Sequence, residues 1–110
     1  MIDRMSDDLE RFDDVHGRVV RLTEERRIHI RAHPEMAGQW ERLEETLAAP
    51  DFIVETVKDQ TVHAYHRKYN QTPVTEKYLV VVVKYLDDDA FVLTAFFSSR
   101  LKRGSIIWQP

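Results

Sequence analysis

Two stretches decide the fold of this chain: Thr61-Val-His-Ala-Tyr-His-Arg-Lys-Tyr69 and Lys77-Tyr-Leu-Val-Val-Val-Val-Lys84. Both are rich in β-branched and aromatic residues, and a polar loop with Pro73 separates them. This composition predicts β-strands, and the same reasoning applied downstream of Pro50 predicts strands at 52–57, 61–69, 78–86, 91–98 and 105–108. The connections at 58–60 and 87–90 are short enough for hairpins, whereas 70–76 is a longer loop, so we expect an antiparallel meander.

Upstream of Pro50 the sequence predicts mainly helix. Residues 17–22 form a short candidate strand. Thr23, followed by two glutamates, is typical of a helix N-cap with acids in the first turn, which predicts a helix over 24–33. Pro34 suits the first turn of a helix, so a second helix is predicted over 34–48. The expected fold class is therefore α+β, with two N-terminal helices packed on a twisted antiparallel β-sheet.

The length of 110 residues predicts a single domain. Residues 1–14 hold six acids and two arginines without periodicity, so we expect an acidic, flexible tail there and one domain over 15–110. The absence of cysteine excludes a disulfide framework. No apolar run approaches the ~18 residues of a membrane span, and the N-terminus lacks the apolar stretch of a secretory signal. We therefore expect a cytoplasmic protein without a membrane partner.

Charge is unevenly distributed along the chain. The net charge is −3, yet three segments each carry three more Lys and Arg than Asp and Glu, namely 15–31, 58–84 and 98–110. If these segments converge in the fold, they predict a basic surface for nucleic acid opposite an acidic one. The alternative is a solvated mixture of charges.

Two histidines, His29 and His33, lie four residues apart and share a helix face with Arg26. RNA carries its own nucleophile, the 2′-hydroxyl, so its cleavage needs only a base, an acid and cations. We predict His33 as the base or acid and His29 as its partner. The alternatives are one surface histidine and one helix N-cap histidine, or half of a zinc site that lacks a third ligand at the expected spacing. Accordingly, no metal and no cofactor is expected.

Alternation along 61–69 places Tyr65, Arg67 and Tyr69 on one face of the sheet. An arginine can bind a phosphate through two hydrogen bonds, and a tyrosine can stack on a base. We predict that Arg67 is catalytic and that the two tyrosines bind substrate. The alternative is cross-strand packing with one solvated arginine.

The next strands and the last turn offer further candidates. Thr94 is predicted to complete the catalytic set, and phosphate contacts are predicted for Lys84, Lys102 and Arg103. Each of these residues also has an ordinary structural reading, as a strand residue or as part of a solvated turn.

Taken in order, these pieces resemble the phage-associated branch of the barnase/EndoU/colicin/RelE-like nucleases. The resemblance covers about residues 17–108 and rests on Leu22-Thr-Glu-Glu25, His29-Ile30, His33-Pro-Glu-Met36, Thr46-Leu47 with Pro50-Asp51, Tyr65-His-Arg67, Lys77 to Lys84, Val92-Leu-Thr-Ala95, Lys102-Arg-Gly104 and Ile107-Trp108. It implies a barnase-like, metal-independent ribonuclease fold in which helix histidines and sheet-borne Arg, Tyr or Thr face one cleft. This chain departs from that pattern at two positions: His66 replaces an aromatic residue, and Phe96 replaces a tyrosine.

Two functions follow as hypotheses. The first is a toxin-like or phage-derived endoribonuclease that cleaves tRNA or mRNA by transesterification and has a cognate inhibitor protein as a further partner. The second is a module of the same fold that binds RNA or protein without catalysis.

Overall fold

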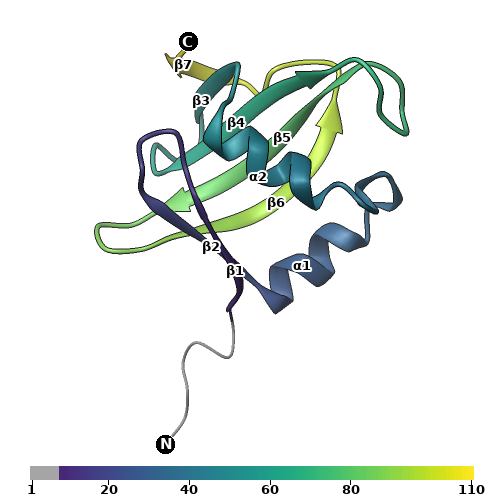
Figure 1. Ribbon diagram of the computed structural model, residues 1–110. Helices are drawn as coiled ribbons and strands as arrows, with labels where there is room; N and C mark the ends of the chain where they lie inside the picture. The colour runs from purple at the N-terminus through teal and green to yellow at the C-terminus, as the bar shows by residue number, and fades with distance from the viewer. Residues whose placement is uncertain (1–7) are drawn as a thin grey trace, which may run out of the picture.

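The computed structural model describes residues 8–110, which form seven strands, two α-helices and one 3-10 turn (Figure 1). The elements are, in chain order, β1 (Asp8–Asp13), β2 (Val19–Thr23), α1 (Glu24–Arg31), η2 (Pro34–Met36), α2 (Trp40–Ala48), β3 (Phe52–Thr56), β4 (Val62–Tyr69), β5 (Lys77–Tyr85), β6 (Ala90–Ser98) and β7 (Gly104–Trp108). All strands belong to one sheet with the order β1-β2-β6-β5-β4-β3-β7.

The predicted meander is confirmed over β3 to β6, where each strand pairs antiparallel with the next. The five downstream strands begin and end within one residue of the predicted positions. Three pairings were not predicted: β1 pairs antiparallel with β2, β7 pairs with β3 instead of following β6, and β2 lies parallel to β6, with Arg21 opposite Phe91. The sheet is therefore mixed, because the N-terminal hairpin joins the β6 end of the meander through a parallel pairing.

The central strand, β5, is buried on both faces. Leu79, Val81 and Val83 join the core that also receives the helices, whereas Val80 and Val82 join a second cluster on the opposite face. Every member of this second cluster comes from a strand, so among residues 8–110 no helix packs against it. We call the face that carries the second cluster the open face.

The α+β class is confirmed, but the order of its elements differs from the prediction. Two strands precede the helices. In addition, the second predicted helix is interrupted: η2 ends at Met36, Gly38 has a positive φ of 75°, and α2 begins only at Trp40. A left-handed residue cannot continue an α-helix, so residues 34–48 form two short pieces. The predicted N-cap is confirmed, since the Thr23 side chain accepts a hydrogen bond from the Arg26 amide.

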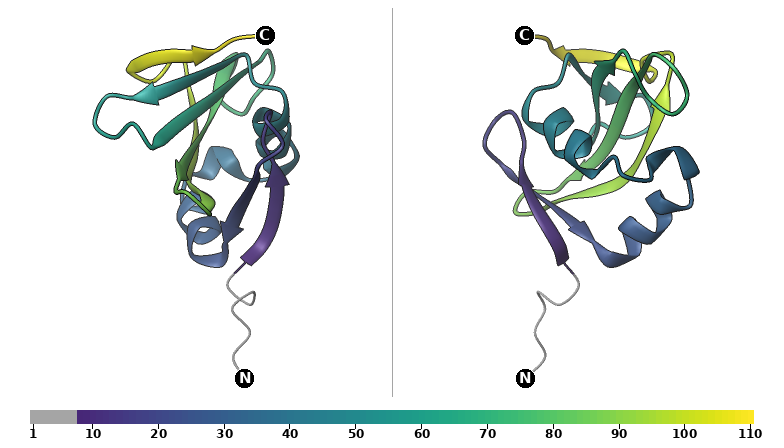
Figure 2. Two further views of the ribbon diagram at one scale, coloured as in Figure 1. Left: turned by 90° about the vertical axis from the view of Figure 1, so that its left-hand side faces the viewer. Right: turned by 45° about the vertical axis from the view of Figure 1, so that its right-hand side comes forward.

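The expected boundary of the acidic tail is wrong. Residues 8–13 form β1, which pairs with β2, while 1–7 lie outside the described residues. Phe12 is buried in the core and Asp14 is buried beside it, whereas Asp13 faces solvent. In Figure 2 the β1–β2 hairpin bends toward the side of the sheet that carries α2, and β1 contacts this helix. Because this segment is rich in acidic residues, the alternation of buried and exposed side chains in it was not recognised in the sequence as a strand pattern.

Residues 99–103 connect β6 to β7, which lie on opposite sides of the meander. This crossover passes over the open face, because the Lys102 amide donates to Nε2 of His66 on β4 at 2.9 Å. It ends at Gly104, where φ is 149° and an added Cβ would lie 2.0 Å from the Glu55 carbonyl oxygen. Only glycine allows the chain to approach β3 this closely.

We expect Gly104→Ala to destabilise the protein by about 2 kcal/mol or more, because a clash with backbone adds to the strain of the positive φ. Urea denaturation monitored by circular dichroism would measure this. Gly38→Ala is the matched control, since its φ is also positive but an added Cβ meets nothing within 4 Å. Equal losses in the two variants would contradict a close approach at Gly104.

Candidate functional site

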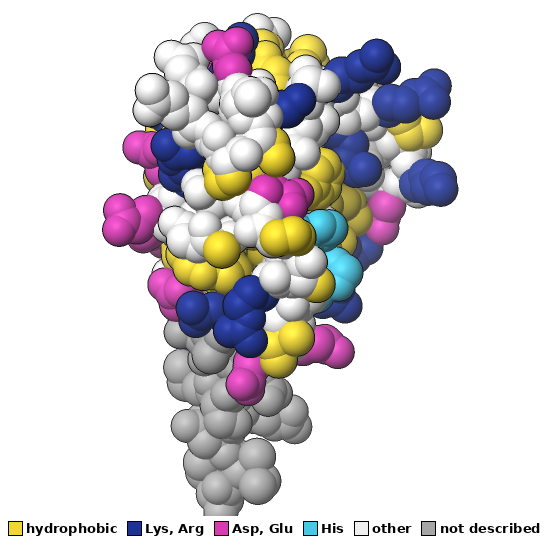
Figure 3. Space-filling view, turned by 90° about the vertical axis from the view of Figure 1, so that its right-hand side faces the viewer, with side chains coloured by type: hydrophobic (Ala, Val, Ile, Leu, Met, Phe, Trp, Pro, Cys, Tyr) yellow, Lys and Arg dark blue, Asp and Glu magenta, His cyan; other side chains and the backbone are white. Residues whose placement is uncertain are grey.

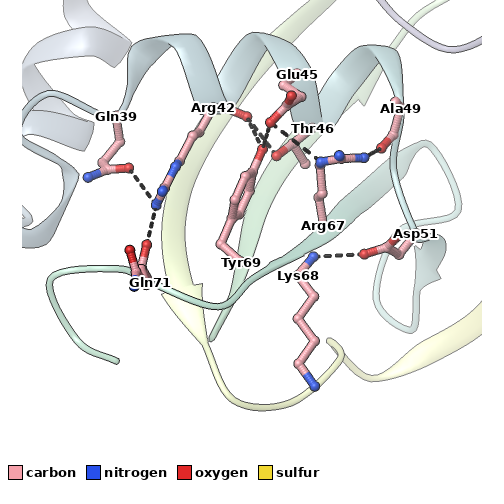
Figure 4. A network of polar contacts seen from close by, with 10 residues as sticks. All are labelled: Gln39, Arg42, Glu45, Thr46, Ala49, Asp51, Arg67, Lys68, Tyr69 and Gln71. Carbon is pink, nitrogen blue, oxygen red and sulfur yellow. Dashed lines mark hydrogen bonds and ion pairs between the residues drawn. The ribbon is translucent and has the colours of Figure 1, made fainter. Parts of the chain in front are cut away.

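On the face covered by helices, β4 presents Arg67 and Tyr69 to α2 (Figure 4). The Tyr69 hydroxyl donates to the Glu45 carboxylate, and the Arg42 guanidinium lies 4.5 Å from the centroid of the Tyr69 ring. Nη1 of Arg67 donates to the carbonyl oxygen of Ala49, the C-cap residue of α2, at 2.6 Å. Because the last carbonyls of a helix lack intrahelical donors, Arg67 stabilises the end of α2.

These contacts give both side chains a structural role. Burial, aided by the hydrogen bond to Glu45, raises the pKa of Tyr69 to about 12, so its hydroxyl stays protonated at neutral pH. Nε of Arg67 also lies 3.5 Å from Oε1 of Glu45. The predicted contacts of Arg67 and Tyr69 with RNA stay predictions, because the partners present are all on α2 or the loop after it.

Tyr65 lies deeper on the same face and is 1% exposed. Its hydroxyl oxygen is 2.6 Å from that of Tyr85, which donates to Oδ2 of Asp14 at 2.8 Å. The Asp14 carboxylate also accepts the amides of His16 and Arg18, each at 2.9 Å. Burial raises the pKa of both tyrosines. This network fastens the β1–β2 turn to the sheet, and Tyr65 is enclosed within it.

Lys84 points to the open face, as does its cross-strand partner Val62. Its Nζ lies 2.8 Å from Oδ2 of Asp59 and 2.6 Å from the Thr61 hydroxyl. The hydrogen bond from Lys84 is the main cause of the low pKa of Asp59. Lys84 therefore stabilises the turn between β3 and β4.

The open face carries aromatic side chains that the sequence analysis did not propose as binding residues. The rings of Phe52 and Tyr78 lie 6.3 Å apart, and Phe96 packs against the same cluster. All three are partly exposed. The signal was present in the sequence, because the predicted alternation places them on the face opposite Tyr65; what was missing was knowledge of which face the helices cover.

Thr94 also belongs to the open face. The register of β5 and β6 shifts between Val82 and Val83, so that Thr94 lies opposite Val82 while Val92 lies opposite Val83. The extra residue, Leu93, packs against the second cluster. This bulge places two consecutive residues of β6 on one side of the strand.

His66 is the buried polar residue of this face. Its Nε2 accepts the Lys102 amide, and its Nδ1 lies 3.0 Å from the Ala64 carbonyl oxygen. An amide can only donate and a carbonyl can only accept, so the ring is neutral with its proton on Nδ1. Burial lowers the pKa of His66 from 6.5 to about 4. Where the resemblance predicted an aromatic residue, this chain has a histidine that holds the crossover in place.

The two predicted catalytic histidines lie on and just after α1. His29 is exposed and His33 is partly exposed, and their ring centroids are 6.1 Å apart. Arg26 lies one turn before His29, and its Nη1 donates to the carbonyl oxygen of Leu93 on β6 at 3.4 Å. This contact fixes the first half of α1 beside the strand that carries Thr94.

Figure 3 shows the flank of the molecule on which histidine side chains are exposed side by side. Hydrophobic side chains adjoin them, and Lys and Arg side chains gather beyond on the same side. The structure thus brings His29 and His33 together, and joins Arg26 to the strand of Thr94. Tyr65, Arg67 and Tyr69 have other partners, which lie on β5, in the β1–β2 turn and on α2.

Among residues 8–110, no three His, Asp or Glu side chains are grouped so that they could hold a metal ion. No helix in this part of the chain is long and apolar enough to cross a membrane.

The protein has an α+β fold in which helices cover one face of the sheet. The open face carries aromatic and basic side chains, and this combination suits an enzyme that acts on nucleic acid. Comparison with protein families supports this class: residues 2–109 match the family model described as phage-Barnase-EndoU-ColicinE5/D-RelE like nuclease2. The chain belongs to this nuclease family. No curated protein and no solved structure gives a significant match.

The state of His66 makes stability depend on pH. Unfolded His66 binds a proton below about pH 6.5, but folded His66 does so only below about pH 4. Unfolding therefore takes up a proton between these values, and the free energy of unfolding falls as the pH drops through this window, by about 3 kcal/mol from this residue.

Urea denaturation at pH 7 and pH 4.5 would measure this loss. His66→Gln keeps an acceptor for the Lys102 amide but cannot be protonated, so we expect its stability to fall less over the same window. An identical pH dependence of the free energy of unfolding in the two proteins would contradict a lowered pKa of His66 in the folded state.

Proposed function

We propose that the protein is an endoribonuclease that binds single-stranded RNA on the open face of its sheet and cleaves it by attack of the 2′-hydroxyl. One observation carries the proposal: in a chain of a nuclease family, the open face presents the partly exposed aromatic residues Phe52, Tyr78 and Phe96 beside unpaired cations. Bases stack on aromatic side chains, and lysine and arginine attract the phosphates.

Three exposed cations beside this face, Arg100, Lys102 and Arg103, lie in the crossover between β6 and β7. None of them forms a salt bridge within residues 8–110, unlike Arg21 and Lys84, which are paired with carboxylates. Phosphates can therefore be bound without breaking an existing ion pair. This supports substrate contacts for Lys102 and Arg103, while Arg67 and Tyr69 are better explained by their contacts with α2.

For the chemistry we propose His29 and His33 as the base and acid. Their rings are close enough for both to contact one phosphodiester, and their exposure leaves them accessible. One imidazole takes the proton of the 2′-hydroxyl, the oxygen attacks phosphorus, and the other protonates the departing 5′-oxygen. Arg26, which donates to the carbonyl oxygen of Leu93, and Thr94, the next residue of β6, are proposed to stabilise charge on the phosphate. Cleavage then leaves a 2′,3′-cyclic phosphate and requires no metal.

The proposal extends to the setting of the reaction. An RNA substrate such as tRNA or mRNA implies a cytoplasmic site of action, and a toxin-like activity of this kind calls for a cognate inhibitor protein. The alternative of a non-catalytic binding module predicts the same RNA affinity without cleavage.

We expect purified protein to cleave RNA in EDTA and to yield 2′,3′-cyclic ends. His29→Ala and His33→Ala should each lower the rate by about 10² or more, since a positioned proton-transfer group typically contributes that much. Electrophoresis of end-labelled RNA would measure the rates.

His16→Ala is the matched control, because His16 is an exposed histidine in the β1–β2 turn. It should cleave at the wild-type rate. Wild-type rates in both His29→Ala and His33→Ala would remove these histidines from the mechanism. RNA binding without any cleavage would favour the non-catalytic module.

RNA affinity should fall steeply with salt, because each neutralised phosphate releases counterions. Lys102→Glu with Arg103→Glu should weaken binding and reduce the slope of log Kd against log salt by roughly 1.4, or 0.7 for each lost contact. Fluorescence anisotropy with a labelled oligonucleotide would measure both effects. Glu41→Lys with Glu44→Lys, two exposed acids on α2, should change the slope little. Affinity that does not respond to salt would exclude a phosphate interface.

A further inference from the structure

A groove of about 550 Å³ lies at one end of the open face. One wall is the turn between β3 and β4 and the other is the end of the crossover; the lining residues are Thr56, Val57, Lys58, Asp59, Val62, Lys102 and Arg103. Its volume falls within the usual range for small-molecule sites.

The charge of this groove favours an anion. Three cations line it, Lys58, Lys102 and Arg103, against the single carboxylate of Asp59. That carboxylate already accepts hydrogen bonds from Lys84 and from the amide and hydroxyl of Thr61. Its charge is therefore compensated, whereas the three lining cations form no salt bridge within residues 8–110.

The groove also offers apolar surface. Val57 is 73% exposed, the most exposed of the large hydrophobic residues in the described part of the chain, and Val62 continues from it to the second cluster. An exposed valine between cations suits a ligand that is apolar at one end and anionic at the other.

One wall of the groove is held in position by the fold. The Lys102 amide is bonded to buried His66, and Gly104 lies against the backbone of β3 on the other side. The backbone that carries the side chains of Lys102 and Arg103 is therefore anchored on both sides, so less ordering is required when a ligand binds.

We propose that this groove binds one nucleotide, with its phosphate among Lys58, Lys102 and Arg103 and its base against Val57 and Val62. The proposal rests on the function proposed above and adds a subsite to it. An RNA strand that lies on the open face would place one nucleotide in the groove, away from His29 and His33. The groove then determines the position along the RNA at which the histidines act.

Nuclear magnetic resonance of the ¹⁵N-labelled protein tests this with three probes: adenosine monophosphate, adenosine and inorganic phosphate. We expect the monophosphate to shift the amides of 57–62 and 102–104, with an affinity about tenfold higher than that of either half alone, because both the charge-assisted contacts and the apolar ones contribute. Equal affinity for phosphate and for the monophosphate would overturn the role of the valines.

Matched variants separate the two contributions. Lys58→Glu should weaken binding of the monophosphate about tenfold, whereas Lys77→Glu, the same charge change at the start of β5, should alter it less than about twofold at physiological salt. Val57→Asn should weaken it, whereas Val74→Asn, at an exposed valine in the loop between β4 and β5, should not. If each variant behaves like its control, the subsite is wrong.

A non-cleavable 2′-O-methyl hexanucleotide distinguishes the subsite from the proposed nuclease. Groove shifts with this RNA, in a protein that does not cleave RNA, would support the subsite and reject the nuclease. Cleavage of RNA without shifts of the groove amides would support the nuclease and reject the subsite. Shifts with the monophosphate but not with the hexanucleotide would assign the groove to free nucleotides and overturn the proposed subsite.

Discussion

Burial of both faces of β5 is the constraint on which the rest of the structure depends. Its consecutive apolar residues, Leu79 to Val83, cannot be covered by helices on one side alone. The helices and the N-terminal hairpin cover one side, whereas side chains of strands alone, both aliphatic and aromatic, cover the other. Because no helix of the described residues packs on that second side, the aromatic rings there stay partly exposed. The same apolar run that stabilises the fold thus creates the surface proposed to bind RNA.

The elements that followed from the sequence are those governed by local rules. Strand composition located β3 to β7 within one residue, and the Thr23 side chain caps α1 as expected. The elements that did not follow depend on distant partners. The burial of Asp14 requires the hydroxyl of Tyr85, far along the chain, and no local pattern in residues 8–14 announces it. Likewise, the parallel pairing of β2 with β6 has no signal in either strand.

The candidate site shows the same division. Alternation correctly separated Tyr65 and Arg67 from His66, but alternation does not say which face a helix will cover. In the structure the polar residues of β4 that were predicted to act on substrate contact α2 and the network at the β1–β2 turn, and their role toward substrate stays a prediction. His29 and His33 lie close together as predicted, although α1 ends at Arg31 and His33 has extended backbone, so the predicted helix over 24–33 is two residues too long. Phe52 and Tyr78 were overlooked because aromatic residues in strands usually indicate core.

The attachment of β2 to β6 has a consequence for how the chain folds. The N-terminal hairpin can pair with the sheet only after residues 90–98 are available, and Arg21 bonds to Asp89 across 68 positions. Contacts of such long sequence separation slow folding, because loop closure must precede them. During synthesis α1 cannot be placed against β6 until residues 90–98 have left the ribosome. The histidines proposed for catalysis would therefore reach their final position only after this strand has joined the sheet.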